Sequence, residues 1–287
     1  MKVRKAIIPA AGFGTRMLPA TKAISKEMLP IVDKPSIQYI VEEAAASGIE
    51  DILIILSRGK NDVVEHFDRQ PLLEQALQKP GKEKLLEDVI YPTTLCNITY
   101  VRQKEQRGLG DAVRYAKDFV GNEPFAVLYG DDVIVSEDPA TAQLIRAYDK
   151  YGKPALAIRE VPDSLIVKYS SLKIDKIEEN YYNVTDMIEK PTLETRLSNY
   201  SILGRCLLTP EVFDILEDLP AGAGGEIQLT DAIRILAERQ GCVGVDFVGR
   251  RYDMGNKLEM CKAIVEMALK HEEIGSDFRE YLRSLDI

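Results

Sequence analysis

Short, almost continuously apolar segments alternate along the chain with longer segments in which apolar residues recur every three or four positions. Residues 51–56 and 125–129 are apolar over most of their length, which predicts strands buried on both faces of a sheet. Residues 35–46 instead carry an apolar stripe, with Pro35 at its start and Gly48 just beyond its end, as is typical of an amphipathic helix. Such alternation predicts a parallel, doubly wound α/β sheet.

Further segments of both kinds continue this alternation to about residue 160. We expect strands at residues 3–8, 97–102 and 155–159, and helices at residues 61–67, 111–120 and 139–151. Residues 72–89 are polar, helical in pattern and interrupted at Pro80–Gly81, so we expect a surface excursion there.

The pattern changes after residue 160, where short alternating runs predict antiparallel strands around a turn at residues 178–180. The remaining expected elements are a strand at 201–208, helices at 210–219 and 226–238, a short β segment at 243–253, and helices at 256–271 and 276–285. The helix at 256–271 carries an apolar stripe made of Leu258, Cys261, Ile264, Val265 and Ala268. We therefore predict a Rossmann-like, mostly parallel sheet with a small antiparallel insertion and C-terminal helices, in a single domain at residues 1–287.

Composition and charge narrow the class of protein. Of the 287 residues, 45% are hydrophobic and 29% are charged, so the chain can bury a large core. Its formal net charge of −9 argues against nucleic acid or an anionic membrane as a main partner. No apolar segment approaches the ~20 residues of a membrane span, and Arg16 and Lys22 interrupt the run that a secretory signal would need. We expect a cytoplasmic protein.

The cysteines and histidines do not form a recognisable metal-binding pattern. The four cysteines have no C-x-x-C spacing, and the chain has only two histidines. We therefore expect no zinc site, and scattered free thiols suit a reducing compartment.

A glycine-containing loop follows the first predicted strand, at residues 9–16 (PAAGFGTR). Small residues and two glycines let the backbone pass close to a ligand, and Arg16, Lys22 and Lys26 place three cations beside it. This combination indicates a polyphosphate site, with a simple tight turn as the alternative. The dinucleotide fingerprint would need a third glycine where Met17 stands, and the Walker loop would need Gly-Lys-Ser/Thr.

An acidic pair follows the strand at 125–129. Open α/β sheets bind ligands at the carboxyl ends of their strands, so Asp131 is a candidate Mg²⁺ ligand facing a triphosphate, and Asp132 is the weaker candidate. The alternative role for these acids is to cap a turn or a helix.

Residues 12–16 (GFGTR), followed by residues 26–30 (KEMLP), resemble the signature of the sugar-1-phosphate nucleotidylyltransferases. Residues 19–30 (PATKAISKEMLP) are most similar to the bacterial branch that uses UTP and glucose 1-phosphate. The resemblance implies transfer of a uridylyl group from UTP to glucose 1-phosphate, giving UDP-glucose and pyrophosphate. It also implies Mg²⁺ as cofactor and a homodimer or homotetramer formed through the C-terminal helices.

The same resemblance assigns roles to individual residues. Arg16, Lys26 and Lys190 would be the catalytic cations, and Asp131 and Asp253 would bind the metal; a helix cap is the alternative for Asp253. The nucleotide would contact residues Ala11, Gly12, Gly14, Thr15, Glu27, Gln103 and Gly108, with Gln103 and Gly108 at the base. The sugar phosphate would contact Tyr169, Ser170, Glu189 and Lys190. These roles divide the domain at about residues 160 and 255 into a nucleotide-binding half, a sugar-phosphate-binding half and a helical tail.

One departure from the family pattern affects the choice of sugar. The family usually has Tyr-Gly where this chain has Tyr169-Ser170, so sugar identity stays open. A sister enzyme for dTTP, CTP or another sugar 1-phosphate is therefore one alternative. A non-catalytic nucleotide-sugar sensor is another, although the five charged residues to which the resemblance assigns substrate and metal binding are all present.

Overall fold

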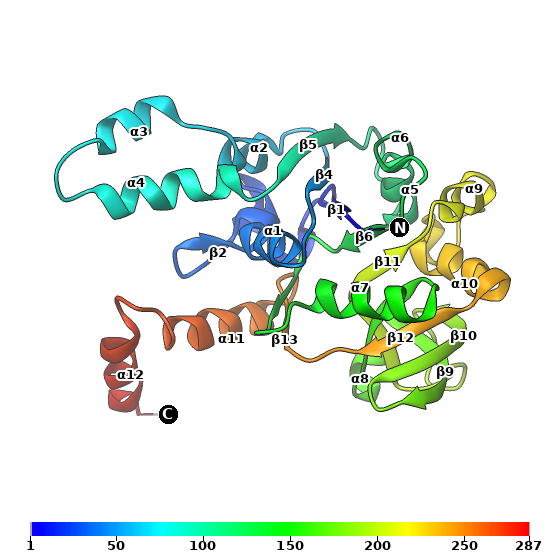
Figure 1. The fold of residues 1–287 in the computed structure, drawn as a ribbon. Helices are drawn as coiled ribbons and strands as arrows, with labels where there is room; N and C mark the ends of the chain where they lie inside the picture. The colour runs from blue at the N-terminus through cyan, green and yellow to red at the C-terminus, as the bar shows by residue number, and fades with distance from the viewer. Residues whose placement is uncertain (1, 287) are drawn as a thin grey trace.

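A nine-stranded mixed sheet forms the centre of the computed structural model, which describes residues 2–286 (Figure 1). All strands run in one direction except β10 and β11. In spatial order the strands are β5 (Asn97–Arg102), β4 (Asp51–Leu56), β1 (Lys5–Pro9), β6 (Phe125–Leu128), β11 (Tyr200–Leu208), β8 (Ala155–Glu160), β12 (Cys242–Asp246), β10 (Tyr181–Glu189) and β9 (Ser170–Glu178). The predicted mostly parallel sheet is confirmed, and the antiparallel insertion extends it at one edge.

Helices cover both faces of this sheet. Neighbouring residues of β1 point to opposite faces, so Ile8 packs in one apolar cluster and Ile7 in another. The first cluster includes side chains of α1 (Ser36–Ala46) and α7 (Ala140–Tyr151). The second includes side chains of α5 (Leu109–Arg114), α9 (Glu211–Asp218) and α10 (Leu229–Gln240). Burial on both faces explains why the strands are continuously apolar, and the predicted doubly wound architecture is confirmed.

Two small two-stranded sheets lie beside the main one. β7 (Asp132–Val135) pairs antiparallel with β13 (Arg250–Asp253), and β2 (Pro30–Ile31) pairs with β3 (Lys34–Pro35). The prediction of one β segment at 243–253 is therefore wrong, because β12 joins the main sheet and β13 crosses to β7. Gly249 between them has φ 145°, which lets the chain change direction.

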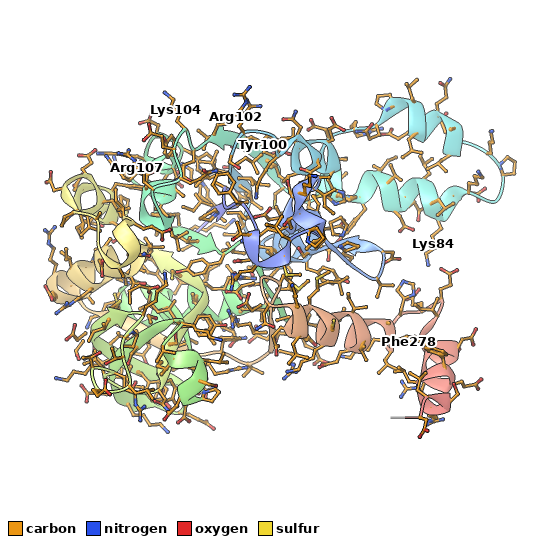
Figure 2. All side chains as sticks on the ribbon, turned by 180° about the vertical axis from the view of Figure 1, so that it is seen from behind. Lys84, Tyr100, Arg102, Lys104, Arg107 and Phe278 are labelled. Carbon is orange, nitrogen blue, oxygen red and sulfur yellow. The ribbon has the colours of Figure 1, made fainter. Side chains whose placement is uncertain are left out.

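Two helical extensions project from the body of the molecule (Figure 1). One contains α3 (Pro71–Leu77) and α4 (Glu83–Ile90) and is the predicted surface excursion; the other is the tail, α11 (Lys257–Ala268) and α12 (Gly275–Ser284). Lys84 of α4 lies 3.5 Å from Glu272, between the two tail helices (Figure 2). The remaining short helices are α2 (Asn61–Phe67), α6 (Lys117–Val120) and α8 (Asp163–Ile166). Within residues 2–286, no helix combines the length and hydropathy needed to cross a membrane.

Helix α11 buries only part of its apolar stripe. Ala263 is buried and Met260 and Met267 pack against the core, whereas Leu258 is 62% exposed and Val265 is 37% exposed. Of the stripe, Ala268 is also buried and Ile264 is half-buried, so only part of it packs against the body. The helix lies against β13 and β2, and its two partly buried methionines pack against the core cluster.

Other helix boundaries also differ from the predictions. The helix expected at 111–120 is two helices, α5 and α6. The helix expected from residue 226 begins at Leu229, because Glu226 is extended and follows a glycine-rich turn with Gly224 and Gly225 in the left-handed region.

Candidate active site

The glycine loop continues directly from the end of β1. Ala10 N–H donates to Ile55 O of β4 at 2.8 Å, which fixes where the loop leaves the sheet. Gly14 has φ 70°, a left-handed conformation that favours glycine, and a Cβ added there would lie 3.0 Å from Lys26 Cβ. Gly12 and Thr15 are exposed. The loop therefore presents open backbone next to Lys26.

Lys26 joins this loop to the end of β6. Its Nζ donates to Asp131 Oδ2 at 2.6 Å, and a Cβ added at Gly12 would lie 3.9 Å from the same Nζ. Burial lowers the pKa of Lys26, but attraction to Asp131 and Glu27 outweighs it and the net pKa is raised. Burial raises the pKa of Asp131, yet Lys26 and Arg16 hold it below its ordinary value. Both groups are therefore charged at neutral pH.

Arg16 lies between the two predicted metal-binding carboxylates. Its Nη2 is 3.3 Å from Asp131 Oδ2, and its Nη1 is 3.7 Å from Asp253 Oδ2. A Cβ at Gly255 would lie 2.3 Å from Arg16 Nη2, so Gly255, two residues after Asp253, leaves room for this guanidinium. Asn256 caps α11 by accepting from the N–H groups of the first turn. The alternative role of Asp253 as the helix cap is therefore wrong.

Asp132 has a different partner from Asp131. Its Oδ1 lies 2.5 Å from Arg251 Nη2, an ion pair without the alignment of a hydrogen bond. Burial raises the pKa of Asp132 to about 6, although Arg251 opposes this shift. Arg251 also lies 5.1 Å from the centre of the Tyr169 ring, and the Tyr169 hydroxyl donates to Asp253 Oδ2 at 3.0 Å. Sequence reasoning did not single out Arg251, although it lies two residues before Asp253.

Lys60 is a second residue that sequence reasoning missed. Its Nζ donates to Glu27 Oε2 at 2.6 Å and to the Ala10 carbonyl at 2.5 Å. Glu27 is fully buried, and its Oε1 has no hydrogen-bond partner among residues 2–286. Burial raises the pKa of Glu27 and lowers the pKa of Lys60. No part of the Glu27 side chain reaches the surface in this structure, so the contact that the resemblance implies between Glu27 and the nucleotide would have to involve its backbone.

The turn that carries Lys26 is held by the connection after β4. Ser25 N–H and Ser25 Oγ donate to the two oxygens of Asp62, at 2.8 and 2.6 Å. Lys60, two residues earlier, binds Glu27 on the other side of Lys26. The two contacts together fix the backbone from which the Lys26 ammonium projects.

Gln103 and Gly108 lie together near Ala11, at the start of the glycine loop. Gln103 Nε2 donates to Asp111 Oδ2 at 2.8 Å and to Gly108 O at 3.3 Å. Gly108 has φ 110°, and a Cβ there would lie 2.6 Å from Ile227 O, so only glycine fits. Gln106 Nε2 donates to Ala11 O at 3.2 Å and joins this segment to the glycine loop. Figure 2 shows Arg102, Lys104 and Arg107 along this same segment.

The predicted sugar-phosphate residues are connected to Asp253 through Tyr169. Lys190 N–H donates to Tyr169 O at 2.8 Å, and Glu189 Oε2 accepts from the Thr230 hydroxyl at 2.8 Å. Lys190 has φ 47°, which is uncommon for a residue with a side chain and marks candidate functional positions. Its side chain is exposed and makes no hydrogen bond or ion pair within residues 2–286.

The side chain of Ser170 does not face this group. Its Oγ accepts from Ile202 N–H at 3.1 Å and lies 3.3 Å from Ser201 Oγ, and the residue is buried. The hydroxyl therefore points to β11. The expected contact between Ser170 and the sugar phosphate can involve only its backbone in this structure.

Most of these residues lie where parallel strands end. The glycine loop follows β1, Lys60 follows β4, Gln103 follows β5 and Asp131 follows β6. The carboxyl edge of such a sheet is where α/β folds bind ligands. Of the three predicted loop cations, Lys22 differs from Arg16 and Lys26. It is exposed and has no side-chain partner in the described part of the chain.

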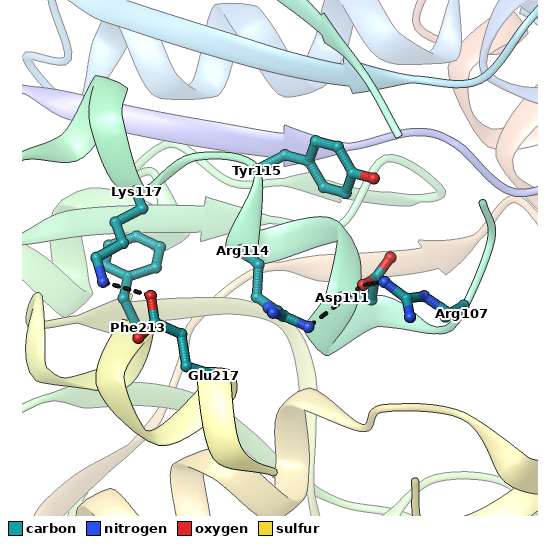
Figure 3. A pocket seen from close by; sticks show the side chains of 7 residues that line it. All are labelled: Arg107, Asp111, Arg114, Tyr115, Lys117, Phe213 and Glu217. Atoms are coloured by element: carbon teal, nitrogen blue, oxygen red, sulfur yellow. Dashed lines mark hydrogen bonds and ion pairs between the residues drawn. The ribbon is translucent and has the colours of Figure 1, made fainter. Parts of the chain in front are cut away.

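A separate surface cavity of about 250 Å³ lies against α5 and α9 (Figure 3). It contains none of the predicted site residues. Its lining side chains are Arg107, Asp111, Arg114, Tyr115, Lys117, Phe213 and Glu217. Asp111 connects it to the site, because the same carboxylate accepts from Gln103.

Comparison with known proteins agrees with the geometry. A model of the nucleotidyl transferase family matches residues 5–270. A UTP–glucose-1-phosphate uridylyltransferase of Staphylococcus epidermidis is 52% identical over 286 residues, covering 100% of this chain and 99% of the relative. One from Staphylococcus haemolyticus is 50% identical over 284 residues, with 99% of each chain covered.

Solved structures extend the similarity to the fold. A UDP-glucose pyrophosphorylase complexed with UDP-glucose matches with a TM-score of 0.85 at 40% identity, covering 94% of this chain and 100% of that one. The UTP-bound UGPase from Acinetobacter baumannii matches with a TM-score of 0.92 at 33% identity, covering 99% and 100%. The family resemblance that the two motifs indicated is therefore confirmed.

Proposed function

The chain belongs to the nucleotidyl transferase family, and we propose that it transfers a uridylyl group from UTP to glucose 1-phosphate. The products are UDP-glucose and pyrophosphate. The observation that carries this proposal is the cluster of two cations and two carboxylates beside an open glycine loop, Arg16, Lys26, Asp131 and Asp253. The named relatives, similar over the full length, support UTP and glucose 1-phosphate as the substrates.

The reaction joins two polyanions. An oxygen of the sugar phosphate attacks the α-phosphorus of UTP in line, the bond from that phosphorus to the β-phosphate oxygen breaks, and pyrophosphate leaves with the electron pair. The attacking phosphate has a second pKa of ~6 and is largely ionised at neutral pH, so no general base is required. Charge compensation and alignment are what the protein must supply.

Three cations of the chain suit those two tasks. Arg16 and Lys26 would bind the triphosphate, because both project beside the open backbone of the glycine loop. Lys190 would bind the sugar phosphate, since its exposed ammonium is not engaged within residues 2–286 and its backbone is tied to Tyr169. Gln103 and Gly108 would bind the base, and Glu189 the sugar hydroxyls.

The two carboxylates fit a divalent cation, and we infer Mg²⁺. Asp131 and Asp253 already converge on one positive group, the Arg16 guanidinium. Mg²⁺ takes one or two carboxylates together with phosphate oxygens and water, and no group of three or more metal-ligating side chains occurs in residues 2–286. The donor set therefore suits an ion that binds together with the nucleotide. Bound there, Mg²⁺ would neutralise charge on the transferred group and on the leaving pyrophosphate.

A substrate panel tests the proposal. Pyrophosphate release is measured with UTP, dTTP and CTP against glucose 1-phosphate and other sugar 1-phosphates, with Mg²⁺ and with excess chelator. We expect UTP with glucose 1-phosphate to give the highest kcat/KM and the chelator to abolish release. Higher kcat/KM for another pair would identify a sister enzyme, and no release from any pair would support a nucleotide-sugar sensor.

We also infer a homodimer or homotetramer formed through the tail. Leu258, Cys261 and Val265 lie three and four residues apart on α11 and expose one apolar face of that helix. Sedimentation velocity at assay concentration should show a dimer or tetramer, and Val265→Asp should shift it toward monomer. A wild-type monomer would rule this assembly out.

A further inference from the structure

The amide of Gln103 has a fixed orientation. Its Nε2 is within hydrogen-bond distance of two atoms, Asp111 Oδ2 at 2.8 Å and Gly108 O at 3.3 Å. A carbonyl oxygen and a carboxylate oxygen only accept hydrogen bonds, so both amide hydrogens are directed at them. The reversed amide would place its carbonyl oxygen against two acceptors. The two neighbouring acceptors therefore fix the amide with its NH2 group toward Asp111 and Gly108 and its carbonyl oxygen away from them.

Asp111 is built to act as an acceptor. It is 1% exposed, and its Oδ1 lies 3.3 Å from Arg107 Nη2 and 3.7 Å from Arg114 Nη1. Figure 3 shows the two guanidinium groups on either side of this carboxylate. They take one oxygen of Asp111 and compensate its charge, which leaves Oδ2 for Gln103.

The polar groups of Gln103 and Gly108 that remain without a partner form a hydrogen-bonding pattern. Within residues 2–286, no donor binds Gln103 Oε1 and no acceptor binds Gly108 N–H. Two residues joined by the 3.3 Å contact between Gln103 Nε2 and Gly108 O thus leave one acceptor and one donor available. Uracil and thymine present the complement, an N3–H donor beside the O4 acceptor. Cytosine presents the inverse, an N3 acceptor beside the N4 amino donor.

We propose that Asp111 is a positioning residue for base selection, because it holds the Gln103 amide with its carbonyl oxygen toward the base. The site then accepts a pyrimidine with an N3–H group and rejects cytosine. This inference rests on the proposed function, in which Gln103 and Gly108 bind the base of the nucleotide. It adds a physical cause for the choice of base: Asp111 does not contact the base but acts through Gln103.

Asp111→Asn tests the inference with almost no change in shape. The two arginines should attract the amide oxygen of residue 111, which turns its NH2 group toward Gln103. Gln103 then gains a donor neighbour and loses its charged acceptor, so its carbonyl oxygen is no longer held toward the base. We expect the ratio of kcat/KM for UTP to that for CTP to fall about tenfold or more, mainly through KM, since one mispaired polar group changes binding by roughly that factor.

The control is the same chemical change in the same cavity. Glu217→Gln alters a carboxylate that binds Lys117 at 2.6 Å and does not contact Gln103, so its UTP/CTP ratio should equal that of the wild type. Binding of UTP and CTP is also measured directly by calorimetry, which needs no turnover. For the wild type, N3-methyl-UTP should bind as weakly as CTP.

The outcomes distinguish a failure of the proposed function from a failure of the proposed role of Asp111. A wild type that releases no pyrophosphate from any substrate pair would refute the proposed function, while the calorimetric UTP/CTP ratios would still test Asp111. A wild-type ratio in Asp111→Asn, by kinetics and by binding, would overturn the inference alone. A loss of UTP preference shared equally by Glu217→Gln would overturn it as well, because the effect would then be a general response of this cavity.

Discussion

Replacing Lys60 with methionine should expose how much the buried pair beneath the glycine loop contributes to stability. The ammonium of Lys60 lies 2.6 Å from Glu27 Oε2, on a glutamate whose side chain is completely buried. Methionine keeps the length and the apolar stem of the side chain but removes its charge. Glu27 would retain only Lys26, whose Nζ lies 4.0 Å from Oε1.

The size of the loss in free energy of unfolding follows from the burial of this ion pair. Breaking a buried ion pair by removing one partner costs about 3–5 kcal/mol, because the other charge is left uncompensated. Lys26 offsets part of this loss, so we expect the lower end, about 3 kcal/mol. For domains of this order of size, each kcal/mol lowers Tm by about 2–4 °C, so the expected decrease is about 6–12 °C.

The decrease should depend on pH in a defined direction. Burial already raises the pKa of Glu27, and loss of Lys60 raises it further. A carboxyl group with a raised pKa in the folded state contributes stability below its unfolded pKa of about 4.3 and loses it as pH rises through the folded value. The gap in Tm between Lys60→Met and wild type should therefore be small at pH 5 and widest at pH 8.

Thermal unfolding followed by circular dichroism measures this for wild type, Lys60→Met, Glu27→Gln and the double variant. The double variant carries no buried charge at this position, so it should recover most of the stability lost in Lys60→Met. Equal Tm values for Lys60→Met and the double variant, or a gap that does not change with pH, would refute the reasoning.

Three further predictions concern the site itself. Lys190→Ala should lose at least about a hundredfold in turnover while its calorimetric Kd for UTP is unchanged, because Lys190 would bind the second substrate; the exposed Lys168→Ala is the control, and near-normal turnover in Lys190→Ala would remove Lys190 from the site. Asp131→Asn should abolish Mg²⁺-dependent pyrophosphate release with Tm within a few degrees of wild type, whereas Asp132→Asn should mainly lower Tm because it breaks the buried pair with Arg251; full activity of Asp131→Asn would point to another ligand. Gly255→Ala should lower turnover about tenfold or more with little change in Tm, since the added Cβ lies 2.3 Å from Arg16 Nη2 and 3.1 Å from Asp253 Oδ1 and so displaces side-chain ends and no backbone; unchanged turnover would show that Arg16 need not lie between the two aspartates.

The fold was largely predictable because its signals are local. Strands buried on both faces are continuously apolar, and helices show the 3.6-residue period, so the alternation around β4 and α1 was visible without the structure. The predictions failed where partners are distant in sequence. The pairing of β7 with β13 joins residues about 120 positions apart, and nothing in either segment specifies the other.

The candidate site divides in the same way. The sequence by itself indicated the glycine loop, the cations Arg16 and Lys26, and Asp131, because residue type and position after a strand predict the chemistry. Asp253 was indicated only by the family resemblance. The tertiary structure alone decided that Lys60 pairs with Glu27, that Gln103 donates to Asp111, and that the methionines of α11 pack against the core. The physical reason is that a charge or an amide acquires its function from the groups within a few ångströms, and folding brings those groups from elsewhere in the chain.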